Sequence, residues 1–283
     1  MSPVITLFCE GANSSLDYKI LSKLDPVSTI LVPSGGKNGL SAFMNGYGAS
    51  PRVTSKEFFR AFRDRDFDYD PGGGLLIRDG KFLIPCRTMI ENYLLHPTTL
   101  FDYIQAKGSK KARLRIGHLS DAEELFREAF KNLRFYSAAR WAHGSIKRQD
   151  KKSFTFNSNW PKDSGDIPKN IGDTDCRIIL GGIIGDIREK INQLNLEVFE
   201  QNYAEFVAKF NDPFFQNIDL CLIWFNGKDV AKMLYMLLGE PNCFLGGETG
   251  DYYDFALNPS RFRVEVFPDL VELRDILNGT MPL

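Results

Sequence analysis

This chain has few cysteines, few histidines and almost no net charge, and each of these features argues against a class of protein. Its 283 residues include five cysteines and three histidines. The cysteines are scattered, without a Cys-x-x-Cys pair or a Cys/His cluster, which argues against a structural zinc site and a disulfide framework. No run approaches the roughly 18 apolar residues of a membrane span, and the first residues lack a basic segment followed by a long apolar stretch. We therefore expect a protein of the reducing cytoplasm.

The formal charge of −1 gives the whole chain no basic signature for nucleic acid, but the charge is uneven. Residues 101–152 hold 13 Lys and Arg against 6 Asp and Glu. Cations beside aromatics such as Tyr136 and Trp141 suit phosphate contact with base stacking, although solvated helix faces have the same composition. Lys37, at the start of a predicted helix, could also hold a backbone phosphate. The expected nucleic-acid contacts are therefore Lys37, Lys110, Lys111, Arg113, Arg140, Lys147 and Arg148.

Alternating apolar runs and polar turns in the first hundred residues predict an α/β fold. Strands are expected at 4–9, 28–32 and 57–63, with helices at 16–24 and 38–45 between them. This order is typical of a mostly parallel sheet with crossover helices. A hairpin is expected around Asp79-Gly80, followed by a helix over residues 90–95.

The rest of the chain divides into a basic, mainly helical insertion at 101–215 and a C-terminal part at 216–283. A capping box at Ser120 to Glu123 starts an amphipathic helix, the polar stretch 147–175 predicts a loop, and 185–210 is expected to be helical. The run 218–225 (IDLCLIWF) is apolar on both faces, as central strands are. We expect it to lie in the sheet of residues 4–9, with one more strand at 261–267, so that the C-terminal part completes the α/β core begun by residues 1–100.

The densest group of chemically useful residues is acidic. Glu10 ends the first expected strand, and Asp64, Asp66 and Asp68 follow the third. Ligands of open parallel sheets bind beyond the carboxyl ends of the strands, where these carboxylates would gather. Their mutual repulsion is costly unless a cation neutralises it, and hard oxygen ligands favour Mg²⁺ or Mn²⁺. A solvated acidic turn is the alternative.

Two further residues could join this site. Glu91 lies beside Ile90 and Leu94, so it is expected to be buried, where it needs either a metal ion or a cationic partner such as Arg87. Lys228 follows an apolar run at an expected helix start, where it could stabilise the charge of a transferring phosphate. An exposed first-turn lysine is the alternative for Lys228.

These motifs resemble the TOPRIM domain of topoisomerases, primases and OLD-type nucleases, which has a glutamate in a Glu-Gly turn and a later Asp-x-Asp pair. The matching segments are Phe8-Cys-Glu-Gly11 and Asp64-Arg-Asp66, with Asp68 as a third acid. Residues 33–37 (PSGGK), 90–95 (IENYLL) and 227–229 (GKD) are further similar to the TOPRIM effector nucleases of PARIS anti-phage systems. The resemblance covers the first 100 residues and about 218–238.

The resemblance implies a divalent-metal-dependent endonuclease, with tRNA as the favoured substrate and DNA as another. It implies a toxic effector of abortive infection that is restrained by an AAA- or ABC-type ATPase encoded nearby and active as a homodimer. The implied catalytic residues are Glu10, Asp64, Asp66 and Lys228. The implied ligands of Mg²⁺ or Mn²⁺ are Glu10, Asp64, Asp66, Asp68 and Glu91.

Two other functions remain open on the sequence. One is a non-catalytic TOPRIM-like module that binds an ATPase partner. The other is a metal-dependent nucleotidyl or glycosyl transferase, in which a DxD motif holds a metal bound to a diphosphate. Such a transferase would have a longer nucleotide-binding domain before its DxD motif than the 63 residues that precede Asp64.

Overall fold

A computed structural model describes residues 5–24, 29–35, 37–49, 58–67, 70, 75–151, 196–239 and 251–281. The chain divides into two compact units. Unit 1 comprises 1–66, 70–133 and 212–283, and unit 2 comprises 67–69 and 134–211. Residues 134–211 of unit 2 fall in the stretch 101–215 that the sequence predicts as an insertion, whereas 67–69 lie outside it.

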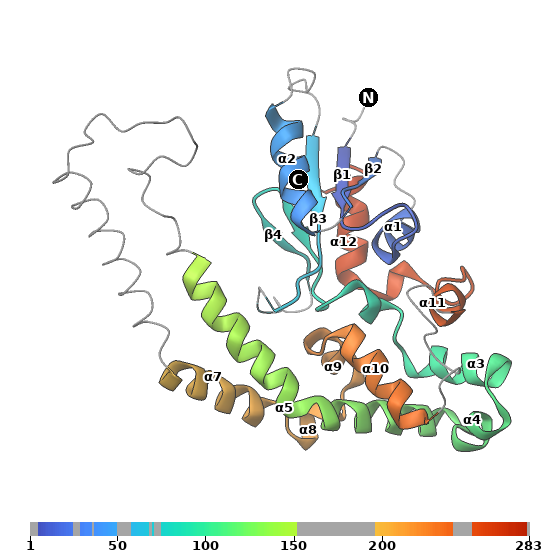
Figure 1. Cartoon of the computed structure of the whole chain (residues 1–283). Coiled ribbons are helices and arrows are strands. Elements are labelled where there is room, and N and C mark those ends of the chain that lie inside the picture. Colours follow the sequence, from blue (N-terminus) through green and yellow to red (C-terminus); the bar gives the residue numbers. More distant parts are fainter. Residues whose placement is uncertain are drawn as a thin grey trace. The chain divides into compact units, whose positions relative to one another are not determined.

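Unit 1 is built on a five-stranded, mostly parallel sheet, in agreement with the predicted α/β class (Figure 1). Its strand order is β2-β1-β3-β5-β4, and only the β4–β5 pair is antiparallel. The strands are β1 (Ile5–Cys9), β2 (Thr29–Pro33), β3 (Phe58–Phe62), β4 (Ile77–Asp79) and β5 (Phe82–Ile84). The register pairs Cys9 with Pro33 and with Phe62, so β1, β2 and β3 end at one edge.

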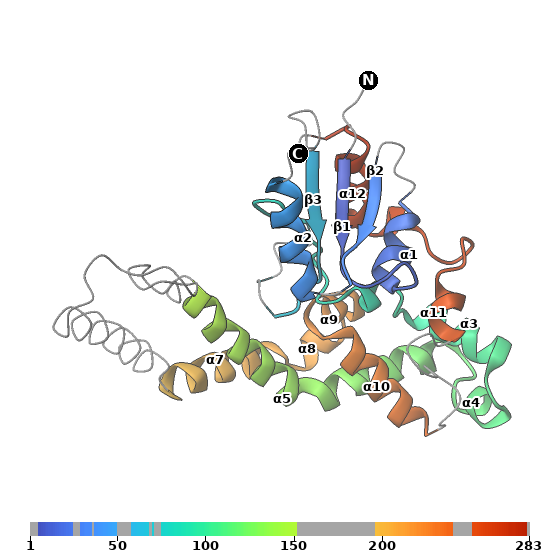
Figure 2. The ribbon, with the colours of Figure 1, turned by 45° about the horizontal axis from the view of Figure 1, so that its top comes forward.

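Helices cover both faces of this sheet. The helices beside the sheet are α1 (Leu16–Ser22), α2 (Lys37–Ala49) and α12 (Pro268–Leu277). Leu40 and Met44 of α2 pack on Phe8, Phe59 and Ala61 of the strands. Figures 1 and 2 show α12 on the opposite face, where the hydroxyl of Thr29 donates to the carbonyl of Leu277.

The segment after β5 leads away from the sheet through one short turn and several helices. The elements are η1 (Ile90–Tyr93, a 3₁₀ helix), α3 (Pro97–Lys107), α4 (Lys110–Arg115), α5 (Leu119–Lys151), α7 (Leu196–Lys209) and α8 (Asp212–Phe215). Helix α5 begins in unit 1 and ends in unit 2. It extends into the stretch predicted as a loop from residue 147, while 152–195 lie outside the described residues.

The prediction of a strand at 218–225 is wrong. The run forms α9 (Ile218–Trp224) and is followed by α10 (Gly227–Leu238). The side chain of Asn217 caps α9 by accepting from the backbone N–H of Leu220 at 2.9 Å. Cys221, Leu222 and Trp224 of this helix are buried. A helix that is largely covered by other elements needs an apolar composition, and this is why its sequence resembles that of a buried strand.

The expected strand at 261–267 is also absent, since that segment contains the short 3₁₀ helix η2 (Val264–Val266). Helix α11 (Asp251–Ala256) precedes it. In the described part of the C-terminal region, the chain therefore returns to the α/β unit through helices and adds no strand to the sheet. The buried carboxylate of Asp269 joins α12 to this unit by accepting from the N–H of Cys86 at 2.9 Å.

Candidate functional site

The turn after β1 places Glu10 at the carboxyl edge of the sheet. Gly11 has a φ of +81°, and a Cβ there would lie 2.5 Å from the Cβ of Ser15, so this turn needs glycine. The hydroxyl of Ser15 caps α1 and contacts the carbonyl of Glu10 at 3.3 Å. The N–H of Gly35 donates to the carbonyl of Gly11 at 2.8 Å, which joins the turns after β1 and β2.

The turn after β3 holds Asp64 and Asp66. Asp64 is buried, and its Oδ1 accepts from the N–H of Ile90 at 2.8 Å. Asp66 has a φ of +51°, the one positive φ among the described non-glycine residues, in a region that aspartate tolerates better than most. Between them, the fully buried Arg65 donates to the carbonyl of Ile223 and the hydroxyl of Thr88, anchoring this turn to α9.

Glu91 and Lys228 meet at the contact between η1 and α10. Gly227 makes this contact possible, because a Cβ there would lie 2.5 Å from Oδ1 of Asn92 and 3.0 Å from the Cβ of Glu91. The Nζ of Lys228 lies 3.6 Å from Oε1 of Glu91. Arg87, the cationic partner suggested by the sequence, instead pairs with Asp219 at 3.2 Å.

A fifth carboxylate, Asp17, belongs to this group although the sequence-based prediction did not include it. Burial, together with the charges of Glu91 and Glu10, raises the pKa of Asp17 from 3.8 to about 7. The signal that could have revealed Asp17 lies in the sequence between Glu10 and Asp17. The glycine turn and the Ser15 cap bring the first turn of α1 back towards Glu10, so a seven-residue separation in sequence becomes proximity in space.

The charges of these carboxylates act on one another. Burial raises the pKa of Asp64 well above 3.8, and the charges of Asp17, Glu91, Asp66 and Glu10 add to the effect in that order. The acid cluster is hereafter these five residues. The sequence predicted three of the four carboxylates that act on Asp64.

Lys228 is the cation that these acids share. Desolvation works to lower its pKa, but the charges of Glu91, Asp64 and Asp17 and a hydrogen bond to Glu91 outweigh this and raise it above 10.5. Lys228 is therefore charged at neutral pH, while its side chain remains 65% exposed. The raised pKa values of Asp17 and Asp64 mean that protons, as well as Lys228, relieve the repulsion between these carboxylates.

The cluster contains oxygen donors of the kind that divalent cations bind. Oδ1 of Asp17 and Oε2 of Glu91 are buried and accept no hydrogen bond from the described residues. Such carboxylate oxygens are costly to bury and are the ligands that Mg²⁺ and Mn²⁺ prefer. Across the described ranges, however, no group of three or more Asp, Glu, His or Cys side chains is placed so that it could hold a metal ion.

Of the remaining predicted site residues, those that the structure describes lie outside the acid cluster. Lys110, Lys111 and Arg113 are exposed on α4, which packs against α3 in unit 1. Arg140 lies in unit 2, 4.3 Å from the ring of Phe67. Asp68 and the side chains of Lys37, Lys147 and Arg148 lie outside the described residues.

Comparisons with known proteins identify no family. No protein-family model matches the chain, and no curated protein matches it. In the described part of the chain, none of the helices combines the length and the apolar character needed to span a membrane.

Proposed function

We propose that this protein is a divalent-metal-dependent endonuclease of TOPRIM-like architecture, with tRNA as its favoured substrate. The acid cluster carries this proposal: five carboxylates and one lysine gather where the parallel strands β1 and β3 end. Ligands of open α/β sheets bind at this edge. Neighbouring carboxylates disfavour one another's ionised forms, and a bound cation would stabilise those forms.

Mg²⁺ often uses only one or two protein carboxylates, and water and substrate phosphates supply its other ligands. The lack of a described three-residue group is compatible with this mode of binding. Glu10, Asp17, Asp64, Asp66 and Glu91 are the described candidates for ligands. A bound Mg²⁺ or Mn²⁺ would lower the pKa of water and offset negative charge on the scissile phosphate.

The protein's own groups have separate roles in this proposal. Asp64 is held by the N–H of Ile90, which fixes one of its oxygens and leaves the other available to a ligand. Lys228 is exposed enough to contact a substrate phosphate, and its charge would stabilise the charge that develops there. Glu10, at the edge of the cluster, is the proposed acceptor of the proton from the attacking water or ribose hydroxyl.

The proposed biological role is that of a cytoplasmic toxic effector in anti-phage abortive infection. The support is the resemblance of residues 33–37, 90–95 and 227–229 to PARIS effectors. An unrestrained nuclease would damage host nucleic acid, so the proposal includes an AAA- or ABC-type ATPase as a restraining partner. It also includes a homodimer as the active form after release.

A non-catalytic binding module is the second candidate. The observation that favours it is the absence, among described residues, of three acids placed to hold a metal. This module would use the same edge of the sheet for binding and would tolerate neutral substitutions in the acid cluster.

The test is a cleavage assay with the purified full chain. End-labelled tRNA, single-stranded RNA and duplex DNA are incubated with Mg²⁺, Mn²⁺ or EDTA. We expect tRNA cleavage with either metal, none in EDTA, and a loss of at least about a hundredfold in Asp64→Asn and Glu10→Gln. Glu128→Gln, which changes an exposed acid of α5, is the matched control and should cleave normally.

Activity that is absent in the wild type, or equal in Asp64→Asn, would reject the nuclease and leave the binding module. Expression in cells with and without the neighbouring ATPase then tests the role. Toxicity should appear without the ATPase and disappear in Asp64→Asn.

A further inference from the structure

Unit 1 contains a cavity of about 640 Å³ that is separate from the acid cluster. It is lined by the segment from Cys86 to Asp102 on one side and by residues 256–269 on the other, and no member of the acid cluster lines it. Ligand pockets in proteins span about 300–1,000 Å³. This cavity is therefore large enough for a small organic molecule, and a bare phosphate would leave most of it empty.

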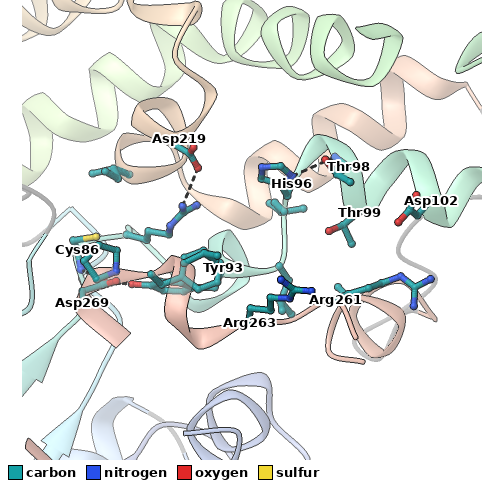
Figure 3. Close-up of a pocket in the computed structure, with 18 of the residues that line it drawn as sticks. Cys86, Tyr93, His96, Thr98, Thr99, Asp102, Asp219, Arg261, Arg263 and Asp269 are labelled. Carbon is teal, nitrogen blue, oxygen red and sulfur yellow. Dashed lines mark hydrogen bonds and ion pairs between the residues drawn. The ribbon is translucent and has the colours of Figure 1, made fainter. Parts of the chain in front are cut away.

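Two of its acidic residues are already satisfied by protein groups (Figure 3). Asp219 pairs with Arg87 at 3.2 Å. Asp269 accepts from the N–H of Cys86 and from the hydroxyl of Tyr93. Neither carboxylate thus needs a cationic ligand.

Two arginines of the cavity have donors to spare. The side chain of Arg263 is exposed and donates no hydrogen bond within the described ranges, although its charge helps to lower the pKa of Glu265. Arg261 is exposed and stacks over the ring of Phe255, its guanidinium carbon 3.9 Å from the ring centre, with one nitrogen 3.5 Å from the hydroxyl of Ser260. Stacking orients this guanidinium and leaves its other N–H groups available.

The start of α3 supplies further donors to the same cavity. Nδ1 of His96 accepts from the N–H of Thr98 at 3.2 Å, so the ring proton of the neutral imidazole is on Nε2. Desolvation lowers the pKa of His96 below 6.5, which keeps the ring neutral at pH 7. The hydroxyls of Thr98 and Thr99 and the positive end of the helix dipole add to these donors.

The other walls of the cavity are apolar and include Leu94, Leu95, Ile223, Ala256 and Val266. A ligand that fits the whole cavity thus has an anionic end and a largely uncharged body. Two guanidinium groups with an imidazole N–H and hydroxyls offer more donors than a carboxylate can accept, and they suit the three terminal oxygens of a phosphate.

We propose that this cavity binds a small organic phosphate of about mononucleotide size. Its phosphate contacts Arg261 and Arg263, with His96 and Thr99 as further donors, and its body packs on the apolar walls. The proposal does not depend on the nuclease function, because the two sites share no residue.

The test is calorimetric titration of the full chain with AMP, adenosine and inorganic phosphate. We expect AMP to bind at least about tenfold more tightly than either of the others, since only AMP has both the charged end and the body. Arg263→Gln and Arg261→Gln should each weaken AMP binding by about tenfold or more. Lys131→Gln, which changes an exposed lysine of α5, is the control and should bind AMP normally.

Three outcomes would overturn the proposal: no binding of AMP, adenosine binding as tightly as AMP, or unchanged AMP affinity in both cavity variants. If inorganic phosphate binds as tightly as AMP, the organic body of the ligand contributes nothing to affinity, and the proposal that the apolar walls bind it is wrong. Thermal unfolding of each variant shows whether it is folded. Asp64→Asn should keep full AMP affinity, which separates failure of this site from failure of the nuclease.

Discussion

Nζ of Lys228, at the first turn of α10, lies 3.6 Å from Oε1 of Glu91 in the 3₁₀ helix η1. Glu91 is 9% exposed in its side chain and Lys228 is 65% exposed, so the pair joins a buried acid to a cation that reaches solvent. This ion pair links α10 to η1 and supplies the cation that the acid cluster shares.

Removing this cation should destabilise the protein modestly. Lys228→Met leaves Glu91 buried beside other acids, and because the lysine is largely exposed we expect a loss of about 1 kcal/mol. Lys232→Met, an exposed lysine on the same helix, should change stability little. Urea unfolding in EDTA measures both variants, and equal stabilities would contradict the proposed role of the pair.

The raised pKa of Asp17 predicts that stability falls as pH rises. In the unfolded chain its carboxyl ionises near 3.8, whereas in the folded protein it ionises near 7. Between these values the folded state holds the proton that the unfolded state has lost, so the free energy of unfolding decreases from about pH 4 to pH 7. Asp64, whose pKa is also raised, contributes with the same sign.

Asp17→Asn should flatten this dependence without abolishing it. Urea unfolding at pH 5 and pH 8, in EDTA, provides the comparison. We expect the variant to gain stability relative to the wild type at pH 8. The interpretation fails if both proteins lose the same free energy between the two pH values.

The close contact at Gly227 can be tested against a second helical glycine. Gly227→Ala places a methyl group 2.5 Å from Oδ1 of Asn92, and overpacking of this kind costs about 1–3 kcal/mol. Gly46→Ala, in α2, has no atom within 4 Å of the new Cβ and should stabilise the helix by about 0.5–1 kcal/mol. Thermal unfolding should thus move in opposite directions for the two variants. A shift in the same direction would show that the η1–α10 contact is looser than described.

Tyr93 and Asp269 provide a test of how the C-terminal helix is attached. The hydroxyl of Tyr93 donates to the buried carboxylate of Asp269. Tyr93→Phe removes that donor, and we expect a loss of about 1.5–3 kcal/mol. Tyr136→Phe, at an exposed tyrosine, is the control and should unfold like the wild type. A wild-type stability for Tyr93→Phe would show that the bond contributes nothing.

The first strands and turns of the sheet could be predicted because local signals and long-range pairing agree. The apolar runs at 4–9 and 57–63 contain β1 and β3, the run at 28–32 matches β2 to within one residue at each end, and the Asp79-Gly80 turn joins β4 to β5. The Glu10-Gly11 turn marked the end of β1 correctly, whereas Pro33, which was expected to stop the second strand, is the last residue of β2. The placement of Glu10 and Asp64 at the strand ends followed from this topology.

Residues 218–225 could not be assigned from their composition. A short apolar run bounded by turns fits either a buried strand or a buried helix, because neither shows periodicity when all its faces are covered. Asn217 and the glycine at 227 are consistent with a capped helix and the start of another, but they also occur at strand ends. Only the packing of Cys221 and Leu222 distinguishes the two.

The cavity lined by His96, Arg261 and Arg263 was also beyond prediction from the sequence. Its arginines follow α11 and its histidine precedes α3, and neither segment contains a ligand-binding motif. The segments meet where α11 packs against α3 through the rings of Tyr252 and Tyr103, and the hydroxyl of Tyr252 donates to the carbonyl of Leu94 at 2.9 Å. Pockets formed in this way depend on tertiary structure alone.

The most direct test of the account is Mn²⁺ binding by the purified full chain, measured by calorimetric titration. We predict that the wild type binds Mn²⁺, that Asp64→Asn and Glu91→Gln lose at least about tenfold in affinity, and that Glu128→Gln binds normally. A wild-type protein without measurable Mn²⁺ binding, or an Asp64→Asn variant with unchanged affinity, would contradict the assignment of the acid cluster as a metal-dependent site.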